Sequence, residues 1–197
     1  MGAAAKFVIG LVLLVGIAGG GLFVLSQQQP TVAAGLKKVP VTAEAAKSFD
    51  DKVKALEQAA AAAKASGKSA PVTATFSEEE LTSAANAASS SASGGVAATD
   101  TQIHLSGGNV IATSNVTVQG ISVPVGVVAT PTVVNGQVQM VVQQVQTGAL
   151  ALPDSIKQQI QAQVGQAISP SALGIPMNVS NLQIQNGQLV LSGTTQP

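Results

Sequence analysis

The chain contains no cysteine, arginine, tryptophan or tyrosine, and each absence excludes a class of function. Without cysteine there are no disulfides, thiolate nucleophiles, iron–sulfur clusters or Cys-ligated zinc sites. Its basic residues are all lysines, eight of which precede residue 69, and the formal net charge is zero. No basic surface is therefore present to neutralise the phosphates of a nucleic acid. With four Phe as the only aromatic residues, the chain also lacks a platform for stacking on sugars or bases.

Groups for catalysis are equally scarce in the second half of the chain. From residue 101 onward the only charged side chains are Asp154 and Lys157, and the only histidine is His104. General acid–base catalysis needs titratable groups within mutual reach, and a metal site needs three or four convergent ligands. We therefore expect no enzyme activity, no cofactor and no metal. We expect His104 on the solvated side of a strand, and the acidic run 78–80 in the solvated first turn of a helix rather than at a metal site.

Hydrophobic residues form one long run near the N-terminus. Residues 7–25, FVIGLVLLVGIAGGGLFVL, are 19 uncharged residues, and at ~1.5 Å per residue a helix of that length crosses a hydrocarbon layer of ~30 Å. The sequence thus predicts a single-pass anchor in the cell membrane, with a short cytoplasmic tail and the bulk of the chain extracytoplasmic. A cleaved signal peptide is the alternative, because Val32 and Ala34 occupy suitable cleavage positions, although the hydrophobic core of a signal peptide is usually shorter.

Helical periodicity follows this segment. Over residues 42–66 apolar positions recur every three or four residues, which predicts an amphipathic helix. Its start is ambiguous, because Ser48 and Asp51 resemble a capping box that would begin the helix near Phe49.

A short strand and a second helix are predicted next. Residues 71–76, PVTATF, alternate as a strand does, and residues 78–88 follow as a helix. Ser77 and Glu80 have the spacing of a capping box, in which each side chain binds the other residue's backbone N–H. The polar segment SSSASGG then predicts a loop.

From Thr101 onward the period of the hydrophobic pattern changes to two. Apolar residues alternate with uncharged polar ones, which predicts antiparallel strands with one apolar face. The turn pairs are Gly107-Gly108, Asn135-Gly136 and Asn186-Gly187. These residues tolerate the positive φ angles of tight hairpins, so the repeated turns predict a sheet built from successive hairpins.

Three features interrupt the strand pattern. Pro124 and Pro131 cannot donate to a strand ladder and predict edges or bulges. The pattern shifts phase between Val179 and Leu182, which predicts a further bulge. Between the strands, residues 155–168 carry an apolar stripe at helical spacing and predict an amphipathic helix.

The apolar faces of these strands predict a binding groove. The helices 78–88 and 155–168 can cover only part of them, so the remainder meets another molecule. Aliphatic side chains without charged groups suit an acyl chain, because each buried CH₂ contributes about 0.8 kcal/mol without any polar contact. The predicted lining consists of Val110, Val116, Val118, Val123, Val125, Val127, Val138, Met140, Val142, Ile156, Ile160, Val164, Leu189 and Leu191.

The order of these segments resembles a known family. An N-terminal span, TFSEEELTSAAN, TPTVVNGQVQMVVQQVQTGALALPDSI and IPMNVSNLQIQNGQLVLSG follow one another as in bacterial membrane-anchored phospholipid-binding proteins of the lipomannan-elongation-associated type, which have TULIP-like folds. The resemblance covers roughly residues 70–197. It implies an α+β fold in which a long curved antiparallel sheet wraps around an amphipathic helix, an extracytoplasmic location, and phospholipid bound in the apolar groove without catalytic residues.

The sequence thus predicts three parts. Residues 1–28 form a transmembrane anchor, residues 29–69 a linker and an amphipathic stalk helix, and residues 70–197 an extracytoplasmic TULIP-like lipid-binding domain. The expected function is binding or transfer of a membrane lipid, or of another apolar ligand. The alternative is a non-catalytic accessory or structural subunit, in which other membrane protein subunits cover the apolar face.

Overall fold

The computed structural model describes residues 29–89, 96–118, 121–147, 150–151 and 177–196. The predicted anchor at residues 7–25 and the predicted helix at residues 155–168 lie outside these ranges. Within them, no helix is long and apolar enough to cross a membrane. The described elements are η2 (Thr31–Ala33), α2 (Ala43–Ser66), β1 (Pro71–Ser77), α3 (Glu78–Ser89), β2 (Val96–Ser106), β3 (Asn109–Val118), β4 (Ile121–Val134), β5 (Gln137–Thr147), β6 (Leu150–Ala151), β7 (Met177–Gln185) and β8 (Gln188–Thr195).

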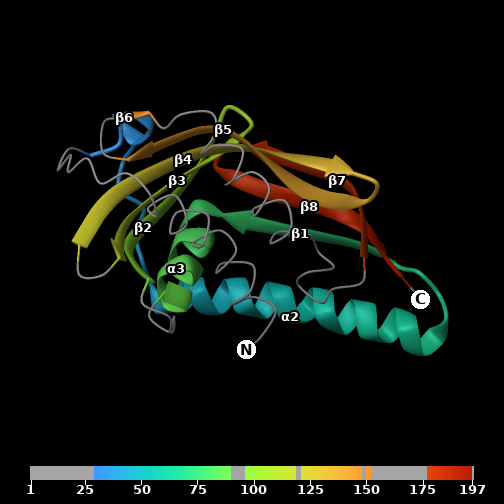
Figure 1. The fold of residues 1–197 in the computed structure, drawn as a ribbon. Helices are drawn as coiled ribbons and strands as arrows, with labels where there is room; N and C mark the ends of the chain where they lie inside the picture. Colours follow the sequence, from blue (N-terminus) through green and yellow to red (C-terminus); the bar gives the residue numbers. More distant parts are fainter. Residues whose placement is uncertain (1–28, 90–95, 119–120, 148–149, 152–176, 197) are drawn as a thin grey trace.

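The strands form two antiparallel sheets, which confirms the predicted α+β class. One sheet has the order β2-β3-β4-β5-β6 and the other the order β1-β8-β7, so the strands are divided between two sheets where the resemblance implied one long one. In Figure 1 the long strands β3, β4 and β5 arch over α3, while α2 runs along the opposite side below β1. The sheets meet where Val179 N–H of β7 donates to Gly136 O in the β4–β5 turn at 2.8 Å.

The predicted hairpin turns are all present. Both residues of Gly107-Gly108, Asn135-Gly136 and Asn186-Gly187 have positive φ, between 51° and 77°. That backbone matches the right-handed twist of the flanking strands, and it sets the strand register. Asparagine and glycine therefore act here as structural residues.

The irregular positions have a common explanation in strand pairing. Pro124 lies in the part of β4 that pairs only with β3, and Pro131 in the part that pairs only with β5. Each proline is thus at a local edge, where its missing N–H breaks no ladder bond. The predicted bulge near Val179 is also confirmed, as the register shifts between Val179 and Asn181.

Helix α2 covers the predicted range but starts earlier than the internal capping box suggested. The Thr42 side chain accepts a hydrogen bond from Ala45 N–H and caps the helix, so a start near Phe49 is wrong. Ser48 does not cap because its hydroxyl donates to Glu80 of α3 at 2.5 Å. The predicted apolar stripe is confirmed by the buried residues Phe49, Val53, Leu56, Ala60 and Ala63.

Strand β2 lies at the edge of its sheet among the described strands, and α3 takes the place of a further strand beside it. The Asn86 side chain binds both backbone groups of Thr101, accepting from N–H at 3.2 Å and donating to C=O at 2.8 Å. The Thr82 hydroxyl does the same for Ile103, at 3.0 and 3.3 Å. Thr82 and Asn86 are four residues apart and so share one face of α3. Thr101 and Ile103 are two residues apart in β2, so their backbone groups point to the same side of the strand. Side chains therefore complete the ladder that a further strand would otherwise form.

One hydrophobic cluster joins the helices to both sheets. It contains most of the buried stripe of α2, Leu81 and the buried alanines of α3, and inward residues of the strands. Within it, the rings of Phe49 in α2 and Phe76 in β1 lie 5.1 Å apart between centroids. The division at residue 70 stays a prediction, but α2 shares its core with strands β1 and β8.

Candidate functional site

The larger sheet carries most of the predicted groove residues on one face. In an antiparallel pair, directly opposed residues point to the same side. The register opposes Val116 to Val123 and Val110 to Ala129, which places the alternating valines of β3 and β4 on the same inward face. On β5, Val142 opposes Ala129 and continues this face.

The described part of the chain accounts for most of the predicted lining. Val110, Val116, Val125, Val127, Val138, Met140 and Leu189 are buried, and Val123, Val142 and Leu191 are half-buried. The side chain of Val118 and the residues Ile156, Ile160 and Val164 lie outside the described part. The structure thus buries or half-buries the described lining residues, while contact with a ligand stays a prediction for every residue of the predicted lining.

A bulge in β5 adds a residue that the alternation missed. The register skips from Val142 to Gln144 opposite consecutive residues of β4, which leaves Gln143 as the extra residue. Beyond the bulge the inward positions change from even to odd, so Val145 faces inward and is 0% exposed. The run QQVQ contains no residue, such as glycine or proline, that would indicate this change of inward positions from the sequence.

Leu189 and Leu191 lie on the smaller sheet. Leu189 opposes Phe76 of β1, and Leu191 opposes Ala74, so these four side chains share the inward face. They belong to the hydrophobic cluster or pack against it. The predicted groove is thus split between two sheets whose inward faces are continuous through the core.

The inward faces provide almost no chemistry beyond burial. Thr101 Oγ1 and Ser114 Oγ lie 3.0 Å apart, and Ser114 Oγ also donates to Thr99 O, so these hydroxyls bind within the protein. Among the described residues no three His, Asp or Glu side chains are placed to hold a metal ion. Such an interior can hold hydrocarbon, but the described residues on its inward faces offer no acid–base pair.

The acidic run at the start of α3 is engaged rather than solvated, so the sequence expectation of a solvated turn is wrong. Glu78 accepts from Leu105 N–H of β2 at 2.6 Å, and Glu79 accepts from the Thr42 hydroxyl at 3.0 Å. Glu80 is 7% exposed and forms an ion pair with Lys52 of α2 at 2.6 Å. The three carboxylates join α3 to its neighbours.

Glu80 is the most constrained of these acids. Its predicted capping box with Ser77 is confirmed, with Ser77 N–H donating at 2.9 Å and Glu80 N–H donating to Ser77 Oγ at 3.2 Å. Burial alone would raise the pKa of the Glu80 carboxyl. Hydrogen bonds from Lys52, Ser48 and Ser77 outweigh burial and hold that pKa below its ordinary value.

A segment before α2 crosses the outer face of the larger sheet. We call residues 30–42 the strap. The register aligns Gln146, Gly126, Thr113 and Gln102 in one row across β5, β4, β3 and β2. The strap follows this row from β5 toward the β2 edge and leads into α2 (Figure 1).

Side chains at both ends of the row hold the strap. Gln146 Oε1 accepts from Val32 N–H at 3.1 Å, and Gln102 Oε1 accepts from Val39 N–H at 2.7 Å. Between them, a Cβ atom at Gly126 would approach strap side chains to 2.5 Å and 2.7 Å. A glycine is therefore required where the strap crosses β4.

The expectation that His104 is solvated is wrong. His104 is 6% exposed. It lies two residues from Gln102 on the same face of β2, and Gln102 binds the strap. The face that alternation assigns to solvent is thus covered at this place.

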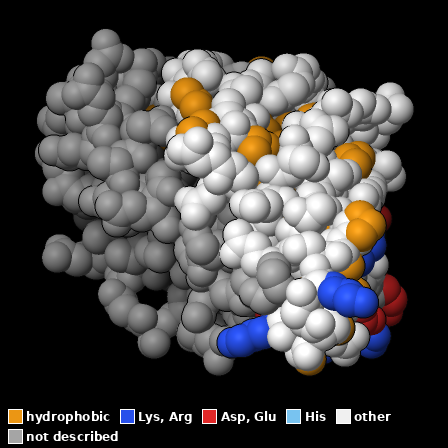
Figure 2. All heavy atoms as spheres, turned by 90° about the vertical axis from the view of Figure 1, so that its right-hand side faces the viewer, with side chains coloured by type: hydrophobic (Ala, Val, Ile, Leu, Met, Phe, Trp, Pro, Cys, Tyr) orange, Lys and Arg blue, Asp and Glu red, His pale blue; other side chains and the backbone are white. Residues whose placement is uncertain are grey.

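Charge is concentrated away from the strands. Asp100 is the single charged residue in the described strands, whereas α2 carries acids and lysines along its length. On the face shown in Figure 2, lysine and acidic side chains gather at the lower edge, and hydrophobic side chains lie singly among uncharged groups above. The strands therefore present a neutral surface.

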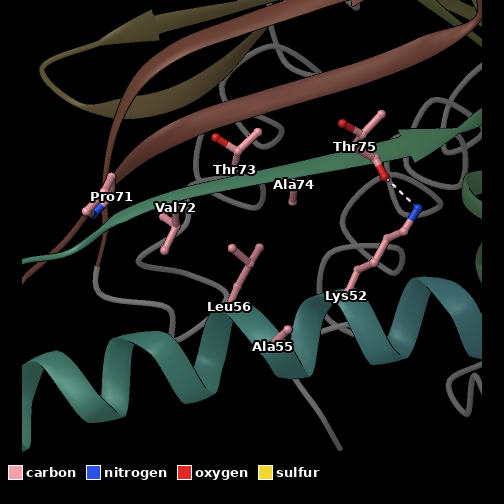
Figure 3. Close-up of a pocket in the computed structure, with 8 residues that line it drawn as sticks. All are labelled: Lys52, Ala55, Leu56, Pro71, Val72, Thr73, Ala74 and Thr75. Carbon is pink, nitrogen blue, oxygen red and sulfur yellow. Dashed lines mark hydrogen bonds between the residues drawn. The ribbon is translucent and has the colours of Figure 1, made fainter.

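A cleft of about 460 Å³ opens between α2 and β1. Lys52, Ala55 and Leu56 line it from the helix, and residues 71–75 line it from the strand. Figure 3 shows Leu56 pointing from α2 toward Val72 and Ala74, which point back from β1. No sequence pattern indicates this cleft, because it depends on how α2 is packed against the edge of a sheet.

The chain matches a known protein family. A family model described as LmeA-like phospholipid-binding matches residues 17–194. The match includes α2 and the strap and thus extends further toward the N-terminus than the resemblance at residues 70–197. No curated protein and no solved structure matches the chain.

Proposed function

Because the chain belongs to the LmeA-like phospholipid-binding family, we propose that it binds a membrane phospholipid against the inward faces of its sheets and makes or breaks no covalent bond. The family match over residues 17–194 carries this proposal. The uncharged, aliphatic interior supports it, because acyl chains bind by burial alone at about 0.8 kcal/mol per CH₂.

The decisive experiment is lipid extraction from the purified protein. The full chain is isolated in mild detergent, and bound lipid is identified by mass spectrometry before and after incubation. We expect phospholipid in fixed proportion to protein, with unchanged mass, and transfer of labelled phospholipid between vesicles. Repeatedly empty protein without transfer would refute the proposal, and a lipid-free complex of fixed stoichiometry would favour the accessory-subunit role.

Two adjacent residues of β5 provide a matched pair of variants. Val142 is half-buried on the inward face, whereas Val141 is 38% exposed on the outer face. We expect Val142→Gln to weaken phospholipid binding by about tenfold, since ~1.4 kcal/mol of apolar burial corresponds to that factor. Val141→Gln should leave binding unchanged. Equal effects of the two variants would contradict binding on the inward face.

We also propose that residues 7–25 anchor the chain and that the described part lies outside the cytoplasm. The absence of cysteine makes this testable with a single introduced thiol. Ala61, exposed on α2, is a suitable position. In intact cells an Ala61→Cys variant should react with a membrane-impermeant maleimide. Reaction only after the cells are lysed would place the domain in the cytoplasm.

A further inference from the structure

The α2–β1 cleft is an opening of the hydrophobic core onto the surface. Leu56 and Ala74 belong to the buried cluster, and Val72 packs against it. Its volume of about 460 Å³ lies within the ~300–1,000 Å³ that is usual for small-molecule sites. A ligand in the cleft would therefore contact the same core as a ligand on the inward faces.

The rim of the cleft carries backbone hydrogen-bonding groups. Among the described strands β1 lies at the edge of its sheet, so one side of its backbone has no described strand beside it. Thr75 O points to this side, since it accepts from Lys52 Nζ at 2.6 Å, and Ser77 N–H points there too, since it donates to Glu80. Outward groups alternate along an antiparallel strand, which assigns the N–H and C=O of Thr73 to the cleft.

These groups suit a lipid better than a peptide strand. A strand added to β1 would need several consecutive outward groups. Lys52 already occupies Thr75 O, and Pro71 has no N–H to offer. The backbone N–H groups of Thr73 and Thr75 stand above apolar walls, an arrangement that instead matches an ester group joined to a hydrocarbon chain.

We propose that the α2–β1 cleft binds one ester-linked acyl chain of the phospholipid. The hydrocarbon packs against Leu56, Val72 and Ala74, and an ester oxygen accepts from Thr73 N–H. This inference rests on the proposed function and adds a site that is separate from the inward face of the larger sheet. Lys52 holds α2 beside β1 at one end of the cleft through Thr75 O and Glu80.

The absence of tryptophan and tyrosine provides the test. Ala55→Trp places the only tryptophan of the full chain in the cleft, at an exposed position. Ala61→Trp is the matched control, since Ala61 is exposed and stands nine residues after Lys52, about two and a half helical turns, which places it on the opposite side of α2. Pro71→Trp gives an independent probe in the cleft if Ala55→Trp does not fold.

Each variant is titrated with phospholipid that carries bromine on its acyl chains, which quenches tryptophan at short range, and bound lipid is measured separately by mass spectrometry. We expect at least twofold quenching at the cleft position and little at the control. Loss of lipid binding in folded Ala55→Trp, but not in Ala61→Trp, would also support the proposal. Normal lipid binding with equal or no quenching at both positions would overturn it and leave the proposed function intact. No bound phospholipid even in the unaltered chain would overturn both.

Discussion

Replacement of Thr82 tests whether α3 truly substitutes for a neighbouring strand of β2. Thr82 is 0% exposed, and its hydroxyl binds both the N–H and the C=O of Ile103. Thr82→Val keeps the shape of the side chain and removes the hydroxyl, whereas Thr82→Ser keeps the hydroxyl and removes a methyl group. Valine, threonine and serine differ little in helix propensity, so the comparison isolates the hydrogen bonds.

The two substitutions should lower the unfolding free energy by different amounts. Thr82→Val leaves two buried backbone groups of Ile103 without partners, and each such group costs about 1–3 kcal/mol. We expect a loss of about 2–6 kcal/mol in unfolding free energy, which for a chain of this size lowers Tm by roughly 4–24 °C. Thr82→Ser loses one methyl group and should cost about 1 kcal/mol.

Thermal unfolding of the purified full chain, followed by circular dichroism, measures the order of the two variants. Hydrogen exchange gives a local readout, because the Ile103 amide should lose protection in Thr82→Val and keep it in Thr82→Ser. If serine destabilises the protein more than valine does, packing rather than edge pairing determines the role of Thr82, and our reasoning is refuted.

Three further outcomes follow from the structure. The folded-state pKa of Glu80 lies below its ordinary value of 4.5, so its carboxylate stabilises the fold above that pH and loses this effect as pH falls through the lowered pKa. The unfolding free energy measured in urea should therefore fall more steeply below about pH 4.5 in the unaltered chain than in Glu80→Gln. Parallel curves of unfolding free energy against pH would contradict this. Gly126→Ala should lower the unfolding free energy by about 1–3 kcal/mol by crowding the strap and make the strap more sensitive to protease. Adding Val32→Ala to Gly126→Ala should restore part of the lost stability. If the double variant loses the sum of the two single losses, contact between these positions is contradicted. In Gly193→Ala the added Cβ would overlap the backbone oxygen of Asn178, which should destabilise the protein by more than about 2 kcal/mol. A thermal midpoint unchanged from that of the unaltered chain would show instead that β7 can move aside.

The elements with strong local signals were predictable from the sequence. Turn pairs such as Asn135-Gly136 fixed the hairpins because their backbone preference is intrinsic. Both prolines of β4 indicated local edges for an equally local reason, the missing N–H. The capping box of Ser77 and Glu80 identified the start of α3 because the two residues lie within one turn.

What could not be predicted depends on contacts between distant segments. Ser48 has the chemistry of a helix cap, but its hydroxyl binds Glu80, which is 32 residues away. His104 occupies a position that alternation assigns to water but is buried, and its neighbour on the same face, Gln102, binds the strap from more than 60 residues earlier in the chain. The inward position of Val145 depends on a bulge that strand pairing alone defines. The α2–β1 cleft likewise exists only because a helix is packed beside a strand edge.

If residues 7–25 anchor the chain, the place of the strap limits how far the domain can lie from the bilayer. Its first residue, Pro30, already lies against the sheet at Gly126. If residues 7–25 are the membrane anchor, only residues 26–29 connect the bilayer to the domain, and even a fully extended chain spans at most ~3.6 Å per residue, or somewhat under ~20 Å in all. A domain anchored by so short a linker cannot carry a lipid across an envelope. It would stay at the membrane surface, and any recipient of the lipid would have to bind it there.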